Sequence, residues 1–386
     1  MPESVLSRLI FGRKEFNREG GRARHIAGGY RCAVKSLELT QIRHELNQIL
    51  AAFTSSRSAK LEQIGSELTP VAKAMSDFIN DGGKRFRPLF AYLGYLASGS
   101  MQRPEILKAC TALELVHVCA LIHDDVMDGS DTRRNKPAIH KSFEAIHRSE
   151  NLNGDAQRFG VASAILLGDL ALVWADRMLV ESGVTQAEFM NCQEVFCEMR
   201  DELMAGQYLD VLEGALATTS VERSLKVARF KSGKYSIERP LHFGAALAGR
   251  NDLFQTFSNY GLPLGEAFQL RDDLLGVFGD PKITGKPSGD DLREGKRTVL
   301  IATTMELAEQ SAKNKLQDGL GKQDISEHEI QELQQIIEGC GASAKVEKLI
   351  TELTEQAISA LQDPRIDTKI ASALEEMAII ATQRSL

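Results

Sequence analysis

The sequence has a helical period almost from end to end, and this feature limits the possible folds most. Apolar residues recur at intervals of three and four, whereas alternating runs and Asn-Gly hairpin signals are nearly absent. The clearest helical patterns cover residues 105–128, 161–180, 188–212, 225–248, 254–278, 299–316, 327–340 and 342–361. Several are apolar on more than one side, which indicates a central helix surrounded by others. We therefore expect a large all-α bundle that can hold a deep central cavity.

The charge pattern divides the chain into a basic head and an acidic body. Residues 1–35 contain eight Lys and Arg but three Asp and Glu, so the other residues carry a net charge of −12 within the total of −7. We expect 1–35 to be a poorly ordered extension, with contact to an anionic membrane surface as the alternative. Because no linker or repeat interrupts the rest, 36–386 is predicted to form one helical domain. An acidic body argues against nucleic-acid binding.

Membrane and redox signals point to the cytoplasm. The most apolar stretch, residues 161–173, is interrupted by Asp169, so we expect no transmembrane segment. The basic head lacks the apolar run of a secretory signal. The six cysteines include no Cys-x-x-Cys and are too sparse for a disulfide framework. A reduced, cytoplasmic setting is the simplest interpretation.

Two aspartate clusters are the strongest candidates for a chemical role. Asp124, Asp125 and Asp128 lie near the end of one apolar helix, and Asp272 and Asp273 lie near the end of another. Carboxylates at a helix C-terminus repel one another and oppose the helix dipole, so they need cations. Oxygen ligands one turn apart suit Mg²⁺, which bridges carboxylates to phosphates. A solvated acidic helix end is the alternative interpretation for each cluster alone.

Basic residues in or beside the helix breaks make that alternative weaker. Arg supplies a fork for phosphate oxygens and Lys a mobile point charge. Each residue alone could be an ordinary solvated charge, but acidic pairs with separate basic segments imply two anionic groups, one held through metal and one held directly. The basic candidates are Lys84, Arg87, Arg133, Arg134, Lys231, Lys286 and Lys296.

Three polar residues within apolar helices are further candidates. His117 precedes Asp124 by seven residues and shares roughly its helix face, although a core histidine bonded to a backbone carbonyl is the usual case. His123 fits that structural role better. Gln207 and Gln269 interrupt apolar patterns, so each is expected to face a neighbour or a cavity.

The motifs GGKRFRP, ALELVHVCALIHDDVMD, DTRRNKPAIH, KSG and FQLRDDLLGVFGD…GKPSGDDLREGK occur in an order and spacing similar to those of the trans-polyprenyl diphosphate synthases. The chain most resembles a bacterial geranylgeranyl diphosphate synthase over roughly residues 45–300. The resemblance implies the isoprenoid synthase fold, a homodimer and Mg²⁺, with three ions expected in each active site. It also implies condensation of isopentenyl diphosphate with an allylic diphosphate, with release of pyrophosphate.

The resemblance assigns roles by matching position. Lys84, Arg87, His117 and Arg134 would bind the diphosphate of isopentenyl diphosphate. Arg133, Lys231 and Lys286 would contact the allylic diphosphate, and Lys296 matches a basic position near the entrance. Ser232 and Gln269 would place oxygen dipoles near the developing allylic cation. The metal set would comprise Asp124, Asp128 and Asp272, supported by Asp125 and Asp273.

The second motif departs from the family pattern. Gly276 stands where a third aspartate is usual, which removes one possible metal contact, and Asp280 is a candidate to compensate. Ser232 replaces the family's usual Thr, and Asn135 follows the arginine pair in place of Gly. Because the other acidic and basic positions are intact, activity is expected to be kept.

Product length is expected to depend on small residues before the first motif. Cys119 and Ala120 lie one turn earlier, where bulky aromatics stop growth at fifteen carbons or fewer in the family. Val116 and Leu113 continue the same face, with Trp174 as a candidate floor. We predict the C20 product, with a farnesyl or a longer-chain (C25 or more) synthase as alternatives.

Three other functions need features that the sequence argues against. A metal-dependent phosphohydrolase needs further His ligands that the eight histidines do not supply in a pattern. A regulatory subunit of a heteromeric synthase usually lacks aspartates of the first motif, and this chain keeps all three. A terpene cyclase would not need Lys84, Arg87 and His117 as a second diphosphate site.

Overall fold

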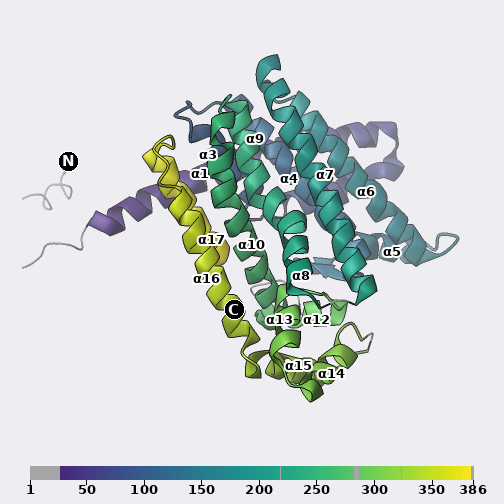
Figure 1. The fold of residues 1–386 in the computed structure, drawn as a ribbon. Coiled ribbons are helices and arrows are strands. Elements are labelled where there is room, and N and C mark those ends of the chain that lie inside the picture. Colours follow the sequence, from purple (N-terminus) through teal and green to yellow (C-terminus); the bar gives the residue numbers. More distant parts are fainter. Residues whose placement is uncertain (1–26, 218, 282–286, 323, 384–386) are drawn as a thin grey trace, which may run out of the picture.

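The computed structural model describes residues 27–217, 219–281, 287–322 and 324–383, which are almost entirely helical (Figure 1). The α-helices are α1 (Ala27–Ile64), α2 (Thr69–Asn80), α3 (Phe86–Leu96), α4 (Pro104–Met127), α5 (Ile139–Ser149), α6 (Ala156–Val180), α7 (Gln186–Leu216), α8 (Val221–Val227), α9 (Arg239–Leu247), α10 (Phe254–Phe278), α12 (Asp290–Glu294), α13 (Val299–Leu307), α14 (Gln310–Gly319), α15 (Glu327–Gly339), α16 (Ala342–Ala360) and α17 (Thr368–Thr382). Short 3₁₀ segments are η1 (Ser66–Leu68) and η3 (Asn251–Leu253), and η2 (Ala228–Glu238) is a π-helix. The prediction of an all-α fold is confirmed.

Within the described residues the strands are two short segments joined as a hairpin. β1 (Thr132–Arg133) pairs antiparallel with β2 (Lys136–Pro137), with Arg133 opposite Lys136. Arg134 and Asn135 at the tip have φ of 54° and 60°, a left-handed conformation that non-glycine residues adopt uncommonly. The tight turn fixes where the arginine pair leaves the backbone.

Most predicted helices have their expected bounds within a few residues. The pattern at 254–278 matches α10 at both ends. The pattern at 225–248 is a continuous helical run, but its middle is the π-helix η2 between α8 and α9. The pattern at 299–316 breaks at Ala308, whose extended backbone separates α13 from α14. Apolar period therefore located the helices but could not distinguish α from π geometry.

The main hydrophobic core surrounds α4, most of which is buried on every side. α3 and α9 approach closely within it, because a Cβ on Gly244 would lie 1.8 Å from the carbonyl oxygen of Ala91. α6 packs along α4, and α17 joins the same core through Leu374 and Met377. A helix that is apolar all round needs this complete enclosure.

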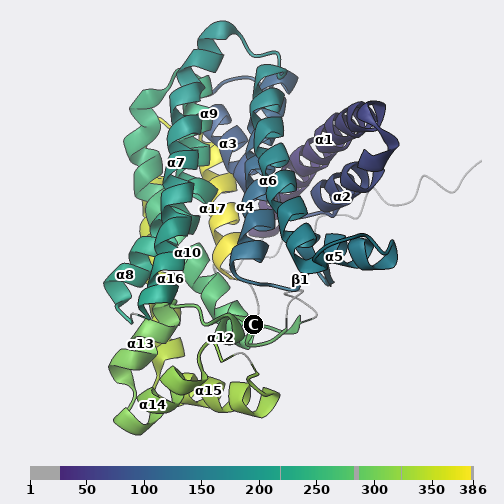
Figure 2. The ribbon, with the colours of Figure 1, turned by 90° about the vertical axis from the view of Figure 1, so that its right-hand side faces the viewer.

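A second hydrophobic cluster lies at one end of the molecule. The C-terminal half of α10 contributes Leu270, Leu274 and Val277, and α12, α13, α14, α15 and α16 cover them. Figures 1 and 2 both place α13, α14 and α15 below the rest of the bundle. α16 runs along α10 and links this end to the main body. The C-terminal helices α12 to α16 thus pack on the end of α10.

The predicted division between 1–35 and 36–386 crosses a helix. α1 begins at Ala27, before the predicted boundary, while residues 1–26 lie outside the described part of the chain. The proposed N-terminal extension and the single-domain assignment both stay predictions.

Two helices are long and apolar enough to span a membrane by length and composition alone, namely α4 and α6. The core helix of a protein outside the membrane passes the same test, so the expectation of no transmembrane segment stays a prediction. In α4, 72% of the most apolar stretch of 18 residues is buried inside the protein, as expected for a core helix. In α6 the share is 39%, which leaves an exposed apolar side.

Candidate active site

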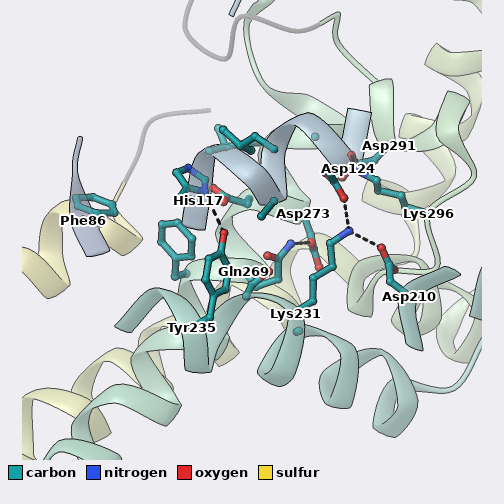
Figure 3. A pocket seen from close by; sticks show the side chains of 18 of the residues that line it. Phe86, His117, Asp124, Asp210, Lys231, Tyr235, Gln269, Asp273, Asp291 and Lys296 are labelled. Atoms are coloured by element: carbon teal, nitrogen blue, oxygen red, sulfur yellow. Dashed lines mark hydrogen bonds and ion pairs between the residues drawn. The ribbon is translucent and has the colours of Figure 1, made fainter. Parts of the chain in front are cut away.

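A cavity of about 880 Å³ lies among α4, α7, η2 and α10 (Figure 3). The first aspartate motif, at the C-terminal end of α4, and the second, in the last turns of α10, both contribute to its lining through Asp124 and Asp272. Lys84, Arg87 and His117 line the same space. The cavity therefore holds an acidic region and a basic region, as the sequence predicted.

Glycine contacts set the position of η2, which carries Lys231 and Ser232. A Cβ on Gly206 of α7 would lie 2.3 Å from the backbone nitrogen of Lys231. On the other side, a Cβ on Gly265 of α10 would lie 2.4 Å from the Cα of Gly233. Because only glycine permits such close backbone approach, η2 is held tightly between α7 and α10. π-helical turns are often found at functional sites, and here the turn lines the cavity.

Asp124 is the centre of a network of cations. Its Oδ1 lies 2.9 Å from the Nζ of Lys231 and accepts a hydrogen bond of 3.1 Å from Gln207, while its Oδ2 is 3.7 Å from Arg133. Burial disfavours the charged form, but Lys231, Lys296 and Arg133 outweigh it and hold the pKa of Asp124 below its ordinary value. Asp124 is therefore an anion.

The other two carboxylates of the first motif have different partners. Asp128 lies 3.1 Å from the Nζ of Lys296, yet burial raises its pKa despite that lysine. Asp125 is fully buried and accepts hydrogen bonds from Nε, at 2.8 Å, and Nη2 of Arg133. Asp125 thus orients Arg133, whose other contact is Asp124. This arrangement agrees with a supporting role for Asp125.

In the second motif, Asp273 is hydrogen-bonded to Gln269. Asp272 and Asp273 both line the cavity, and Asp273, the more buried of the two, accepts a hydrogen bond of 2.7 Å from Gln269 one turn earlier. Burial, with the nearby Asp291 and Asp272, raises the pKa of Asp273 to about 8. Because the amide of Gln269 donates to Asp273, its oxygen remains the part of the amide that can face the cavity.

Asp291 of α12 fills the space beside Gly276. A Cβ at position 276 would lie 2.1 Å from Oδ2 of Asp291. Lys296 lies between this carboxylate and the first motif, 3.6 Å from Asp291 and 3.1 Å from Asp128. Gly276 is therefore not a gap in the acidic lining, since a carboxylate from another segment stands there. The sequence had suggested Asp280, which does not line the cavity in the described part of the chain.

The carboxylates that line the cavity suit Mg²⁺. Among the described residues no group of three or more His, Cys, Asp or Glu side chains forms a ready-made metal cage. Mg²⁺ does not need one, because it is usually bound by one or two carboxylates together with substrate phosphates and waters. Asp124 and Asp272 offer such oxygens from two helices that line one cavity. The residues fit the ion.

The basic region combines α3, α4, η2 and the β1–β2 hairpin. Arg87 is buried and donates to the hydroxyls of Tyr235, at 2.5 Å, and Ser236, at 2.7 Å. His117 lies 3.1 Å from the Tyr235 hydroxyl. Arg134 donates to the carbonyl of Phe78 at 3.3 Å and lines the cavity. Burial and four nearby arginines hold the pKa of His117 well below its ordinary value, so the imidazole is neutral.

Only some of the other predicted site residues line the cavity in the described part of the chain. Ser232 and Lys84 line the cavity, and Lys286 lies outside the described residues. Ala120 lines the cavity, but the rest of the predicted tail wall is buried in the main core without reaching the cavity in the described structure. That group comprises Cys119, Val116 and Leu113, whose role in product length stays a prediction. Trp174 packs edge-on against Phe53.

His123 has a structural role. Its Nε2 lies 3.1 Å from the carbonyl of Ile165 on α6, and its Nδ1 lies 3.7 Å from the sulfur of Cys119. Gly168 makes room for the ring, since a Cβ there would lie 2.1 Å from Nε2. His123 therefore joins α4 to α6 outside the cavity lining, as the sequence suggested.

Sequence reasoning missed four residues of the site. Asp210 of α7 lies 2.6 Å from the Nζ of Lys231, and Tyr235 connects Arg87 with His117. Glu114 pairs with Arg85 at 2.6 Å in the cavity wall, both fully buried. Asp291 lies within the motif GKPSGDDLREGK but is not among the site residues predicted from the sequence. Asp210 follows Gln207 by three residues, so a shared helix face was the available signal.

Two carboxylate-bearing helix ends with cationic side chains around one deep cavity define an enzyme that handles diphosphate groups. Residues 69–337 match the family model for polyprenyl synthetase. The chain belongs to this family and is a prenyltransferase, which joins isopentenyl diphosphate to an allylic diphosphate. The predicted family and enzyme class are confirmed.

Individual relatives share most of their length with this chain. A geranylgeranyl pyrophosphate synthase structure from Corynebacterium glutamicum, in complex with isoprenyl diphosphate and magnesium, has 41% identity and a TM-score of 0.87, with 90% of this chain and 99% of that one covered. The geranylgeranyl diphosphate synthase of Methanosarcina mazei is 31% identical over 78% of this chain and 88% of its own. The geranylfarnesyl diphosphate synthase of Aeropyrum pernix is 30% identical over 78% and 91%.

Proposed function

We propose that this prenyltransferase makes all-trans geranylgeranyl diphosphate from isopentenyl diphosphate and an allylic diphosphate of five to fifteen carbons. The observation that carries the proposal is the single cavity in which both aspartate motifs and a separate basic cluster meet. The relatives from Corynebacterium glutamicum and Methanosarcina mazei, both named for the C20 product, support that length. The geranylfarnesyl synthase among the relatives makes C25 the principal alternative.

The acidic region is assigned to the allylic diphosphate. Asp124, Asp128 and Asp272 would hold Mg²⁺, with three ions proposed for each site. When bound, Mg²⁺ neutralises the diphosphate and favours its departure as a leaving group. Lys231, beside Asp124, would bind the diphosphate oxygens, together with Arg133 and Lys286. Lys296 would keep Asp128 and Asp291 in place near the entrance.

The basic region is assigned to isopentenyl diphosphate. Arg87 and Arg134 are forks suited to phosphate oxygens, and Lys84 adds a mobile charge. A neutral His117 adds an N–H donor without a further positive charge. Two anionic groups thus have separate partners, so the reactants are held at contact in a defined order.

The reaction follows from this arrangement. The allylic C–O bond breaks, the double bond of isopentenyl diphosphate attacks the resulting cation at C1, and a proton then leaves the condensed product. Ser232 and Gln269 would direct oxygen dipoles toward the cation without needing to reorganise. The departed pyrophosphate is placed to accept the proton, so the protein needs no general base. The apolar cavity wall, including Phe86 and Phe268, keeps water from the cation.

A product assay tests the function. The enzyme would be incubated with Mg²⁺, labelled isopentenyl diphosphate and one primer of five, ten or fifteen carbons, and products would be resolved by chain length. We expect a C20 product from each primer. A main product of C15, C25 or longer would replace the C20 assignment, and the absence of any elongated product would contradict the enzymatic assignment itself.

We also propose a homodimer that joins through α6 and α7. These helices expose large apolar side chains, among them Leu166 and Val173 on α6 and Tyr208 on α7, with 66%, 57% and 67% exposure. Apolar area of this extent on two long helices fits a second copy of the same chain. Light scattering should give twice the mass of 42.5 kDa, and L166E/Y208E should give a monomer. A native monomer would contradict the proposal.

A cytoplasmic location is proposed as well. The described cysteines Cys110, Cys119, Cys192, Cys197 and Cys340 are free thiols, which suits a reducing compartment. Fractionation of cells that express the tagged chain would test it, with recovery in the membrane pellet as the contrary result.

A further inference from the structure

The hydroxyl of Tyr235 contacts both Arg87 and His117, two residues that no sequence motif connects with it. Tyr235 belongs to η2, Arg87 to α3 and His117 to α4, so three elements meet at one oxygen. Figure 3 shows the contact between Tyr235 and His117. The oxygen lies 2.5 Å from Nη2 of Arg87 and 3.1 Å from Nδ1 of His117. The guanidinium of Arg87 also stands 4.1 Å from the centre of the Tyr235 ring. Tyr235 therefore touches Arg87 through both its ring and its hydroxyl.

The direction of one hydrogen bond follows from the donor inventory: a guanidinium only donates, so the Tyr235 oxygen accepts from Arg87. The direction of the other depends on the His117 tautomer. We assign the hydroxyl proton of Tyr235 to Nδ1 of His117, which lies 3.1 Å from the oxygen. Nδ1 can accept only when it carries no proton. In a neutral imidazole the ring proton is then on Nε2, the nitrogen on the opposite side.

Protonation at this site agrees with that direction. Burial and the positive charges of Arg87, Arg134, Arg133 and Arg85 hold the pKa of His117 well below its ordinary value. Burial also raises the pKa of Tyr235, so the phenol keeps its proton. A neutral phenol beside a neutral imidazole allows two consecutive hydrogen bonds, from Arg87 to the Tyr235 oxygen and from the Tyr235 hydroxyl to His117. We call this pair of hydrogen bonds the relay.

We propose that Tyr235 is a positioning residue for the diphosphate of isopentenyl diphosphate. It fixes His117 as the tautomer with the proton on Nε2, and it turns the guanidinium of Arg87 so that its other donors remain for the ligand. Within the described residues Nε of Arg87 is buried and has no hydrogen-bond partner, whereas Nη2 is taken up by Tyr235 and Ser236. This inference rests on the proposed assignment of the basic region.

Replacement of Tyr235 by phenylalanine removes one oxygen and keeps the ring against Arg87. In Y235F the relay is broken, Nδ1 of His117 loses its donor, and both tautomers become accessible. We expect the KM for isopentenyl diphosphate to rise about 10-fold, with kcat changed less than about 3-fold and the KM for the allylic substrate unchanged. A residue that only fills space would leave all three constants unchanged.

Nitrogen NMR of histidine-labelled protein reads the tautomer directly, without substrate. The His117 signals are assigned by their loss in H117N. In the native protein they should show a protonated Nε2 and an unprotonated Nδ1, and in Y235F they should shift toward a mixture. S236A is the matched control, because Ser236 bonds to Arg87 but not to His117, so the tautomer should stay as in the native protein.

Native-like tautomer and KM values in Y235F would overturn the relay, as would a native His117 protonated on Nδ1. Failure of the proposed function is a separate result. If the native enzyme did not use isopentenyl diphosphate, the role in substrate positioning would fall with it, while the NMR comparison would still decide whether Tyr235 sets the tautomer.

Discussion

The carboxylate of Asp291 stands in the space that a side chain at position 276 would need. A Cβ on Gly276 would lie 2.1 Å from Oδ2 of Asp291, far inside van der Waals contact. Two segments thus share one place: α10 supplies a glycine and α12 supplies the carboxylate. An aspartate at position 276, which the family usually has, would therefore clash with Asp291 of α12.

This relationship predicts that G276D does not improve the enzyme. The added side chain must displace Asp291 and its contact with Lys296, so kcat/KM should fall at least about 10-fold. The exchange G276D/D291G removes the clash and returns a carboxylate to the same place, so it should recover part of the loss. G214A is the control, since nothing lies within 4 Å of a Cβ at Gly214. A fully active G276D would contradict the steric account.

Asp210 should prove to be a positioning residue for Lys231. Its carboxylate lies 2.6 Å from the ammonium group, which also contacts Asp124 at 2.9 Å. D210N should lower kcat about 3- to 10-fold, whereas K231A, which removes the group itself, should lower it about 100-fold or more. Steady-state kinetics at saturating substrates would measure both. D318N, an exposed aspartate of α14, should behave as the native enzyme, and equal kinetics for D210N and D318N would exclude the role.

Ala120 should control product length, because it is the member of the predicted tail wall that lines the cavity. Larger side chains there would shorten the space available to the growing tail. Radiolabelled products from A120V, A120L and A120F should become progressively shorter, with A120F making mainly C15. If A120F kept the native product distribution, the tail would have to follow another wall.

Neutral His117 should make the folded protein sensitive to acid. Its folded pKa lies below the ordinary 6.5, so the unfolded chain binds more protons in between, and stability falls as the pH drops below about 6.5. From pH 7 to pH 5, H117N should lose about 1–2 kcal/mol less unfolding free energy than the native protein. Urea unfolding at both values would measure this. H328N replaces a side chain that is 80% exposed, so its unfolding free energy should change between the two pH values as that of the native protein does. An identical change in unfolding free energy for H117N and the native protein would mean that folding does not lower the pKa of His117.

The buried pair of Arg85 and Glu114 should matter more for stability than any surface pair. Arg85 also donates to Asn47 and to the carbonyl of Ile79, so it cannot leave when its partner is removed. E114A should cost about 3–5 kcal/mol, because a buried guanidinium loses its counter-charge. D77A breaks the exposed pair with Lys73 and should cost less than about 1 kcal/mol. Similar losses in chemical denaturation for both variants would show that Arg85 is solvated after the change.

The fold and the main site residues could be predicted because their signals are local. The apolar period of residues 254–278 predicted both ends of α10, and the one-turn spacing of Asp124 and Asp128 marked an acidic helix end. The contributions of Asp210, Asp291 and Tyr235 depend on how distant helices meet, which no local pattern contains. The π geometry of η2 likewise depends on Gly206 and Gly265 from neighbouring helices. The positions of Cys119, Val116 and Leu113 depend on the rotation of α4 relative to α6 and α7, which period alone leaves open.

Lys231 forms an ion pair with Asp124, and Lys296 forms one with Asp128. A divalent ion would bind the same two carboxylates. A bare ion would have to displace an ammonium group from Asp124 or Asp128, and the displaced lysine would keep only its remaining carboxylates, Asp210 for Lys231 and Asp291 with Glu294 for Lys296. An ion that arrives with a diphosphate brings the replacement anion for both lysines. Competition between lysine and metal for the same carboxylates would therefore link cation uptake to the presence of substrate.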